Sequence, residues 1–110
     1  FRSSRRMASS DRILREYPFS ILLPAGGLLP DAEPGEEILV QGVIDCLFRE
    51  GDGWVLIDYK TDRLDDADAF IKRYGVQISL YRQAVEKISG RPVREAYMYS
   101  FRLETAIRVE

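Results

Sequence analysis

The sequence has no histidine and a single cysteine, Cys46, and both shortages restrict the chemistry that the chain can perform. Without histidine, neither a Ser-His nor a Cys-His catalytic pair can form within the chain. One thiol can neither close a disulfide nor hold a cysteine-ligated iron-sulfur cluster within the chain. Because Cys46 lies in an apolar run, we expect it to be a buried structural residue.

Long apolar runs and a strong excess of one charge are also missing. The apolar runs are far shorter than a membrane span, so we expect no contact with a membrane and a cytoplasmic location. The 16 basic and 18 acidic residues nearly cancel, so contact with nucleic acid requires a local basic patch. The N-terminal segment is rich in arginine, a pattern typical of a solvated helix face or tail: Arg2, Arg5, Arg6, Arg12 and Arg15.

The 110 residues provide enough apolar sequence for one domain, residues 1–110, with one modest core. The chain begins at Phe1, and its first segment resembles the end of a helix rather than a whole element. We therefore expect the chain to be a C-terminal fragment of a larger protein.

Apolar periodicity predicts an α/β fold in which helices pack on a sheet. Helix-compatible residues occupy 3–14, and a second helical pattern follows Asp65, with Gly75 as a candidate break. A Pro- and Gly-rich segment is expected to be a long loop at 24–37. The remaining apolar runs predict strands at 16–23, 38–49, 54–60 and 93–101, with a further candidate at 105–109. Pro18 predicts an edge position or a strand start for the first of them.

The clearest signal is a β-hairpin with Gly51 and Asp52 at its turn. A turn centred between these two residues places Asp45 opposite Asp58, with Cβ atoms ~4.5–5.5 Å apart. A three-residue loop would shift this register by one. Lys60 lies two residues beyond Asp58 and shares its face, whereas Tyr59 points to the other face.

Two carboxylates at that distance repel each other and lose hydration, so they need a compensating positive charge. A divalent cation such as Mg²⁺ provides it, because carboxylate oxygens and water are its preferred ligands. Such an ion, held by Asp45 and Asp58, polarises a phosphate and lowers the pKa of bound water. Lys60 can orient that water or stabilise developing charge. The structural alternative is an Asp-Lys ion pair that only fixes the hairpin register.

The spacing Asp45…Asp58-x-Lys60 resembles the D…DxK core of the PD-(D/E)XK nuclease superfamily. Residues 42–45 (GVID) and 58–62 (DYKTD) are similar to a signature of its RecB-like branch, which is found in helicase-nucleases. Residues 77–81 match a Q-x-x-x-Y motif, and residues 15–19 resemble an E-x-P-F strand. The resemblance covers residues 15–101 and implies a restriction-endonuclease-like core, with a central mixed β-sheet flanked by helices.

The resemblance also implies the roles of the residues on the two central strands. Asp45, Asp58 and the main-chain carbonyl of Tyr59 would be ligands of Mg²⁺, for which Mn²⁺ can substitute. Lys60 would be the catalytic lysine. A histidine that usually reaches the metal in this family is absent here, and we expect it to lie upstream of the chain. The iron-sulfur cysteines of some relatives are absent too.

Gln77 and Tyr81 would line the site and contact the DNA backbone, since they lie one helical turn apart on one face. A helix facing a sheet also often buries a tyrosine and a hydrogen-bonded glutamine for purely structural reasons. Glu16 would either support the metal site or be a charge at the start of a strand.

The resemblance implies a Mg²⁺-dependent exonuclease domain that acts on one unwound DNA strand. Its parent would be an ATP-dependent helicase-nuclease with a partner subunit, which processes double-strand breaks for recombinational repair. The chain has no Walker-type glycine loop, so ATP binding and unwinding would lie in upstream parts. Two alternatives are a non-catalytic nuclease-like module that guides DNA or binds another subunit, and a stand-alone RecB-like exonuclease.

Overall fold

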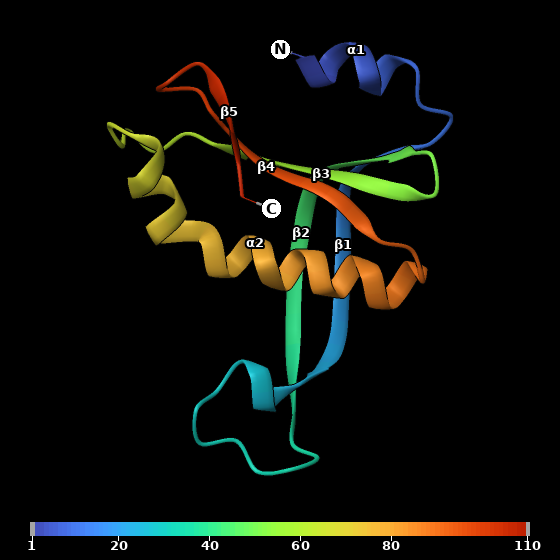
Figure 1. Cartoon of the computed structure of the whole chain (residues 1–110), viewed down its shortest axis with the longest axis vertical. Coiled ribbons are helices and arrows are strands. Elements are labelled where there is room, and N and C mark those ends of the chain that lie inside the picture. The colour runs from blue at the N-terminus through green and yellow to red at the C-terminus, as the bar shows by residue number, and fades with distance from the viewer. Residues whose placement is uncertain (1, 110) are drawn as a thin grey trace.

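The computed structural model describes the backbone of residues 2–109 and the side chains of residues 5–109. It confirms the predicted α/β class, with a five-stranded mixed sheet and helices (Figure 1). The elements along the chain are α1 (Arg2–Ala8), β1 (Ile13–Pro24), the 3-10 helix η1 (Ala25–Gly27), β2 (Glu37–Glu50), β3 (Gly53–Lys60), α2 (Ala67–Ser89), β4 (Val93–Ser100) and β5 (Thr105–Arg108).

The strands lie in sequence order, β1-β2-β3-β4-β5, and only the β3–β4 pair is parallel. A parallel pair needs a crossover, which α2 provides. The sheet separates α1 from α2 in Figure 1, so the two helices flank it as expected. β1 is an edge strand, which agrees with the position of Pro18.

Both faces of the central strands are buried, because each face receives a helix. On the α2 face, Ile44 and Leu56 pack with Ile78 of the helix. On the α1 face, Met7 covers a cluster of Cys46, Phe48, Val55 and Ile57. The burial of Cys46 confirms the structural role expected for this thiol.

The hairpin has the predicted register. Arg49 pairs with Trp54, and Cys46 pairs with Ile57, around a turn at Gly51 and Asp52. Gly51 has φ +62°, a left-handed conformation that glycine adopts without steric cost.

α2 is one continuous helix, so the expected break at Gly75 is wrong. Asp66 caps its first turn by accepting a hydrogen bond from the Ala69 N–H at 2.8 Å. Gly90 ends it in the left-handed conformation, as the sequence predicted. The burial of Phe70 and other residues on the sheet-facing side offsets the ~1 kcal/mol that a helical glycine costs.

The N-terminal segment also departs from its expectation. The helix ends at Ala8, and Ile13 already pairs with Phe48 in the sheet, so the helix predicted over 3–14 is too long. Backbone pairing with β2 is a tertiary interaction, which weak local periodicity does not report.

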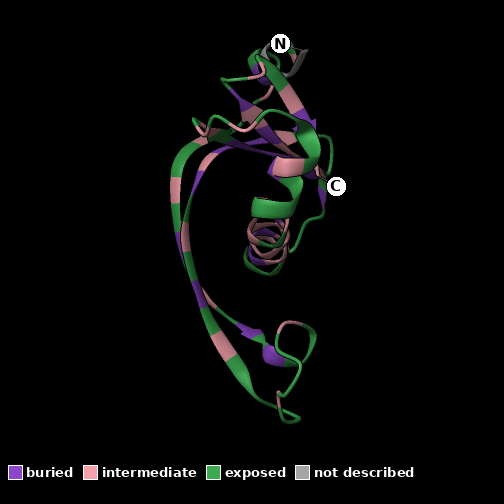
Figure 2. Ribbon diagram, turned by 90° about the vertical axis from the view of Figure 1, so that its left-hand side faces the viewer, coloured by how far each residue is buried: buried purple, intermediate pink, exposed green. Residues whose placement is uncertain are grey.

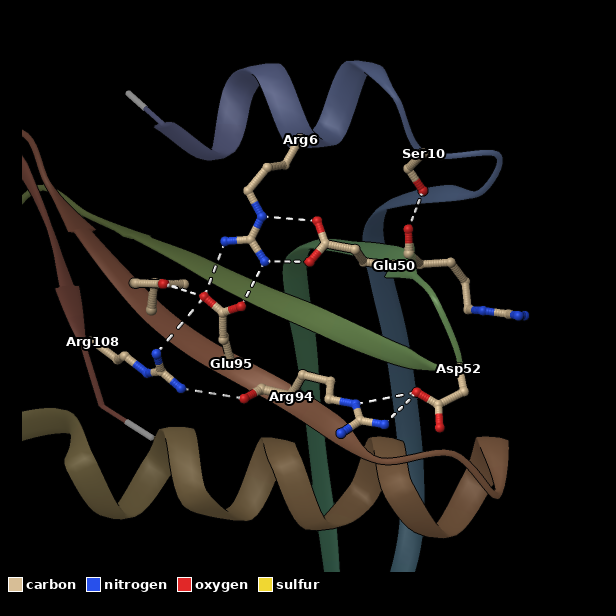
Figure 3. A network of polar contacts seen from close by, with 9 residues as sticks. Arg6, Ser10, Glu50, Asp52, Arg94, Glu95 and Arg108 are labelled. Carbon is tan, nitrogen blue, oxygen red and sulfur yellow. Dashed lines mark hydrogen bonds and ion pairs between the residues drawn. The ribbon is translucent and has the colours of Figure 1, made fainter.

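Arg6 attaches α1 to the sheet (Figure 3). Its guanidinium donates two hydrogen bonds to Glu50 of β2, at 2.8 and 2.5 Å, and two to Glu95 of β4, at 3.0 and 2.6 Å. Arg6 is therefore bound to two carboxylates rather than solvated, which corrects the expectation for this arginine. The prediction for Arg2 lies outside the described side chains.

β1 and β2 extend well past α2 as a curved arm that carries η1 and the loop before β2 at its tip (Figure 2). Apart from the three residues of η1, this connection is the loop that its composition predicted. No helix in residues 2–109 is long and apolar enough to cross a membrane.

Candidate active site

The sheet forks where the two strands of the hairpin separate, and the candidate site lies in this fork. Pairing between β2 and β3 ends at Cys46 and Ile57. Beyond that pair, β2 continues along β1, while β3 continues along β4 as far as Lys60. The next residues on the two branches are Asp45 and Asp58, so the register that predicts their proximity also places them at the point of divergence.

Asp45 closes the fork through its side chain. Its Oδ2 accepts a hydrogen bond from the Tyr59 N–H at 2.8 Å, in the place where a strand partner would offer a main-chain carbonyl. The N–H and C=O of one residue in a strand point to the same neighbour. The Tyr59 carbonyl therefore faces the β2 side, where Asp45 lies.

Asp58 is the buried carboxylate of the site, with 8% of its side chain exposed. Its pKa is raised to about 6, chiefly by burial and in part by the nearby Asp45 carboxylate, while Lys60 opposes the shift. Lys60 Nζ lies 2.6 Å from Asp58 Oδ2 and forms an ion pair with it. Apart from this ammonium, no hydrogen-bond donor of the described residues reaches that buried oxygen.

Lys60 is held from three directions. Besides the ion pair to Asp58, its ammonium donates to Gln77 Oε1 at 2.9 Å and lies 3.8 Å from the centre of the Tyr74 ring. The Tyr74 hydroxyl in turn donates to Asp62 Oδ2 at 2.8 Å. Tyr74 and Asp62 are thus members of the site that the sequence did not single out. The available signal was position, since Tyr74 lies three residues before Gln77 on the same face of α2.

Tyr81 lies against β2 at the floor of the fork. Its ring meets Phe19 edge-on, with centroids 5.2 Å apart. Burial raises the pKa of the Tyr81 hydroxyl, and the nearby charges of Asp58 and Asp45 raise it further. A Cβ at Gly42 would lie 2.7 Å from the Tyr81 oxygen, which explains why β2 carries a glycine there.

Glu16 borders the same region from the edge strand. Residues 15, 16, 45 and 59 line a hollow of about 600 Å³ beside the fork. Glu16 has φ +49°, and the β1–β2 pairing skips it between Arg15 and Tyr17. A non-glycine residue in this conformation is uncommon and often marks a functional position.

The donor set fits a hard divalent ion of the Mg²⁺ type. No group of three His, Cys, Asp or Glu side chains lies within metal-binding reach in the part of the chain that the structure describes. Mg²⁺ does not need such a cage, because it is commonly bound by one or two carboxylates together with water and substrate phosphate. The pKa of Asp58 stays raised even with Lys60 beside it, so the two carboxylates would gain from the added positive charge of such an ion.

Comparison with known proteins gives a consistent result. A family model described as the PD-(D/E)XK nuclease superfamily matches residues 2–109. Proteins named as the A subunit of an ATP-dependent helicase/nuclease are 44% identical in Pelotomaculum thermopropionicum, over 96% of the chain, and 44% identical in Alkaliphilus oremlandii, over 94%. The same-named protein of Clostridium botulinum is 38% identical over 96% of the chain. The chain spans 9% of the length of each of these relatives.

Proposed function

Because the chain belongs to the PD-(D/E)XK nuclease superfamily, we propose that it hydrolyses DNA phosphodiesters with the help of Mg²⁺ bound in the fork. The observation that carries this proposal is the meeting of two carboxylates, Asp45 and Asp58, beside the ammonium of Lys60. A purely structural ion pair needs one carboxylate, and a second one beside it is unfavourable without a further cation.

Each residue of the fork has a role in this reaction. Asp45 and Asp58 would hold the ion, with the Tyr59 carbonyl as a further ligand. When bound, the ion polarises the phosphate and lowers the pKa of water. Lys60 orients the attacking water or stabilises charge that develops on the phosphate. Gln77 holds Lys60 in place through its 2.9 Å hydrogen bond.

The outer residues of the site bind the substrate. Gln77 and Tyr81 contact the DNA backbone from α2, and Glu16 supports the metal site from the hollow beside Asp45. These roles are proposals that the geometry favours, since all three side chains lie on the borders of the fork.

The parent protein follows from the names of the relatives. We infer that the chain is the C-terminal nuclease domain of an AddA-like helicase-nuclease, which acts as an exonuclease on an unwound strand. ATP hydrolysis and unwinding belong to upstream parts, and an AddB-like protein is the expected partner. Processing of double-strand breaks for recombinational repair, in the cytoplasm, is the corresponding cellular role.

The direct test is cleavage of an end-labelled single-stranded oligonucleotide with Mg²⁺. The Asp58→Ala variant is expected to lose this activity and to retain its circular dichroism spectrum and melting behaviour. Undiminished cleavage by the folded variant would contradict the proposed mechanism.

A second test locates the metal. Crystals soaked in Mn²⁺ are expected to show anomalous density between Asp45 and Asp58. An intact ion pair between Asp58 and Lys60 at millimolar Mn²⁺, with no anomalous density, would favour the structural role for these residues in this chain.

A further inference from the structure

Three aromatic side chains gather at the ends of β3 and β4, on the opposite side of the catalytic strand from Lys60. Tyr59 and Phe101 are stacked, with centroids 5.9 Å apart, and Tyr99 meets both edge-on, at 6.3 and 5.2 Å. We refer to Tyr59, Tyr99 and Phe101 as the aromatic cluster. The cluster is close to the catalytic residues in the chain, because Tyr59 lies between Asp58 and Lys60 on β3.

Two rings of the cluster are exposed, unlike the aromatic residues of the core. Phe101 is 54% exposed and Tyr59 36%, whereas Phe48 and Phe70 are completely buried. A ring that serves only to stabilise the fold gains most by being covered, since the free energy of burial scales with the area removed from water. Because the ring of Phe101 is exposed, most of this free energy of burial is not gained.

Phe101 is nevertheless fixed in position. Its N–H donates to the Lys60 carbonyl at 3.2 Å, which ties the ring to the end of the catalytic strand. The turn that follows it is held by the buried Ser100 hydroxyl, which accepts a hydrogen bond from the Leu103 N–H at 3.0 Å. The aromatic surface is therefore preorganised, and a ligand would not have to order it.

Charges on the two sides of the stacked pair indicate what could bind there. Tyr59 borders the hollow of about 600 Å³ that contains Asp45. Phe101 borders a second hollow, of about 310 Å³, whose other lining residues are Thr61, Arg63 and Arg102. A strand that crosses the rings from the first hollow to the second would thus leave a carboxylate site and meet two arginines.

We propose that the aromatic cluster is a stacking platform for unpaired bases of the nucleic-acid strand whose backbone enters the fork, with Arg63 and Arg102 binding the next phosphates. This inference rests on the proposed nuclease function and names the surface that would hold its single-stranded substrate. Exposed rings beside cationic side chains are the usual means of binding single strands without sequence preference. A duplex keeps its bases stacked inside and offers no free face to the rings.

The test measures binding separately from cleavage. Affinity for a fluorescein-labelled oligo-dT is measured by anisotropy in EDTA, where no metal-dependent cleavage occurs. Phe101→Ala is expected to weaken binding by roughly 5- to 100-fold, the effect of losing one stacked base. Phe101→Trp keeps the π face and is expected to retain the affinity. The matched control is Leu39→Ala, which removes a side chain of similar exposure (58%) from the arm and is expected to bind normally.

Two further measurements separate stacking from charge. The wild-type chain is expected to bind an oligonucleotide with abasic sites more weakly than it binds oligo-dT. The Phe101→Ala variant is expected to bind both oligonucleotides with the same low affinity. Arg63→Gln is expected to lower the salt dependence of binding, by about 0.7 in the slope of log K against log salt, whereas Phe101→Ala leaves that slope unchanged.

Unchanged oligo-dT affinity in Phe101→Ala overturns the inference, and it is the result expected if another protein surface covers the cluster. Equal affinity of the wild-type chain for duplex and single strand overturns it as well. A failure of the proposed function would give a different result. The Asp58→Ala variant would still cleave DNA with Mg²⁺, and the binding measurements on Phe101→Ala would be unaffected.

Discussion

The two faces of the sheet each carry a pair of carboxylates, and the pairs are neutralised in opposite ways. On the α1 face, one guanidinium donates four hydrogen bonds to Glu50 and Glu95 (Figure 3). Hydrogen bonds from Arg6 and Tyr97 lower the pKa of Glu95 to about 2. On the α2 face, burial raises the pKa of Asp58 to about 6, although Lys60 lies beside it.

The difference lies in the supply of donors. Arg6 has five N–H groups in a rigid fork, so it can satisfy two carboxylates at once. The Lys60 ammonium divides its contacts between Asp58 and Gln77, and the pKa of Asp58 stays raised despite the ion pair. A pair of carboxylates with all its donors holds elements together, whereas a pair whose charge is only partly compensated is suited to binding a cation. Substitutions on the α2 face and on the α1 face of the sheet test this comparison.

The largest effect is expected for Asp58→Asn. This change removes the buried charge and keeps the volume, so nuclease activity should fall to background while the free energy of unfolding stays equal or rises. Activity is measured on single-stranded DNA, and stability by urea denaturation. Marked destabilisation would mean that Asp58 has a structural role like that of Glu95.

Lys60→Ala should have a smaller effect on catalysis. Loss of transition-state stabilisation predicts a rate decrease of ~10²-fold, with Mn²⁺ binding preserved because the carboxylates remain. Single-turnover cleavage and Mn²⁺ titration by electron paramagnetic resonance measure the two quantities. Equal losses of rate and metal affinity would show that Lys60 acts by organising the carboxylates.

The pH dependence of metal binding should follow Asp58. Its pKa of about 6 means that a proton competes with the ion below that pH, so affinity for Mn²⁺ should fall about tenfold per pH unit.

The stability contributions of the carboxylates on the two faces should also depend on pH in opposite directions. The raised pKa of Asp58 makes its contribution to stability largest at low pH, and this contribution is lost as the pH rises from about 4 through 6.

The lowered pKa of Glu95 makes its contribution present above about pH 4.5, and this contribution is lost as the pH falls toward 2. Urea denaturation of the wild-type chain and of Asp58→Asn across pH 2–7 separates the two contributions. A wild-type stability profile identical to that of Asp58→Asn over this range would contradict the raised pKa.

The smallest effects concern the α1 face. Arg6→Ala leaves Glu95 partly buried without its main donor, and it should lower the free energy of unfolding by about 1–2 kcal/mol. The control is Arg94→Ala, which breaks an exposed ion pair with Asp52 and should leave the free energy of unfolding almost unchanged. Equal effects in thermal or urea denaturation would remove the distinction between the two arginines.

The hairpin and its two aspartates could be predicted from sequence because their arrangement depends on local geometry. A two-residue turn fixes the register, and the register brings Asp45 to Asp58. The same holds for the cap at Asp66 and the stop at Gly90, which act within one turn of the helix.

Other features depend on elements far apart in the chain, and the sequence did not report them. The position of the Tyr74 ring beside the Lys60 ammonium requires the packing of α2 on the sheet. The bond of Arg6 to Glu95 joins residues 89 positions apart. The left-handed backbone of Glu16 occurs where the edge pairing is interrupted, and nothing in its side chain favours that conformation.

The hydrogen bond from the Tyr59 N–H to Asp45 also bears on which ion the fork can select. It occupies one oxygen of Asp45, as Lys60 occupies one oxygen of Asp58. In the proposed metal site, each aspartate would then have one oxygen free of these contacts, and the bidentate contacts that large, high-coordination ions such as Ca²⁺ use would compete with them. The site would therefore favour a small ion that retains most of its water, and the backbone of β3 would contribute to this preference.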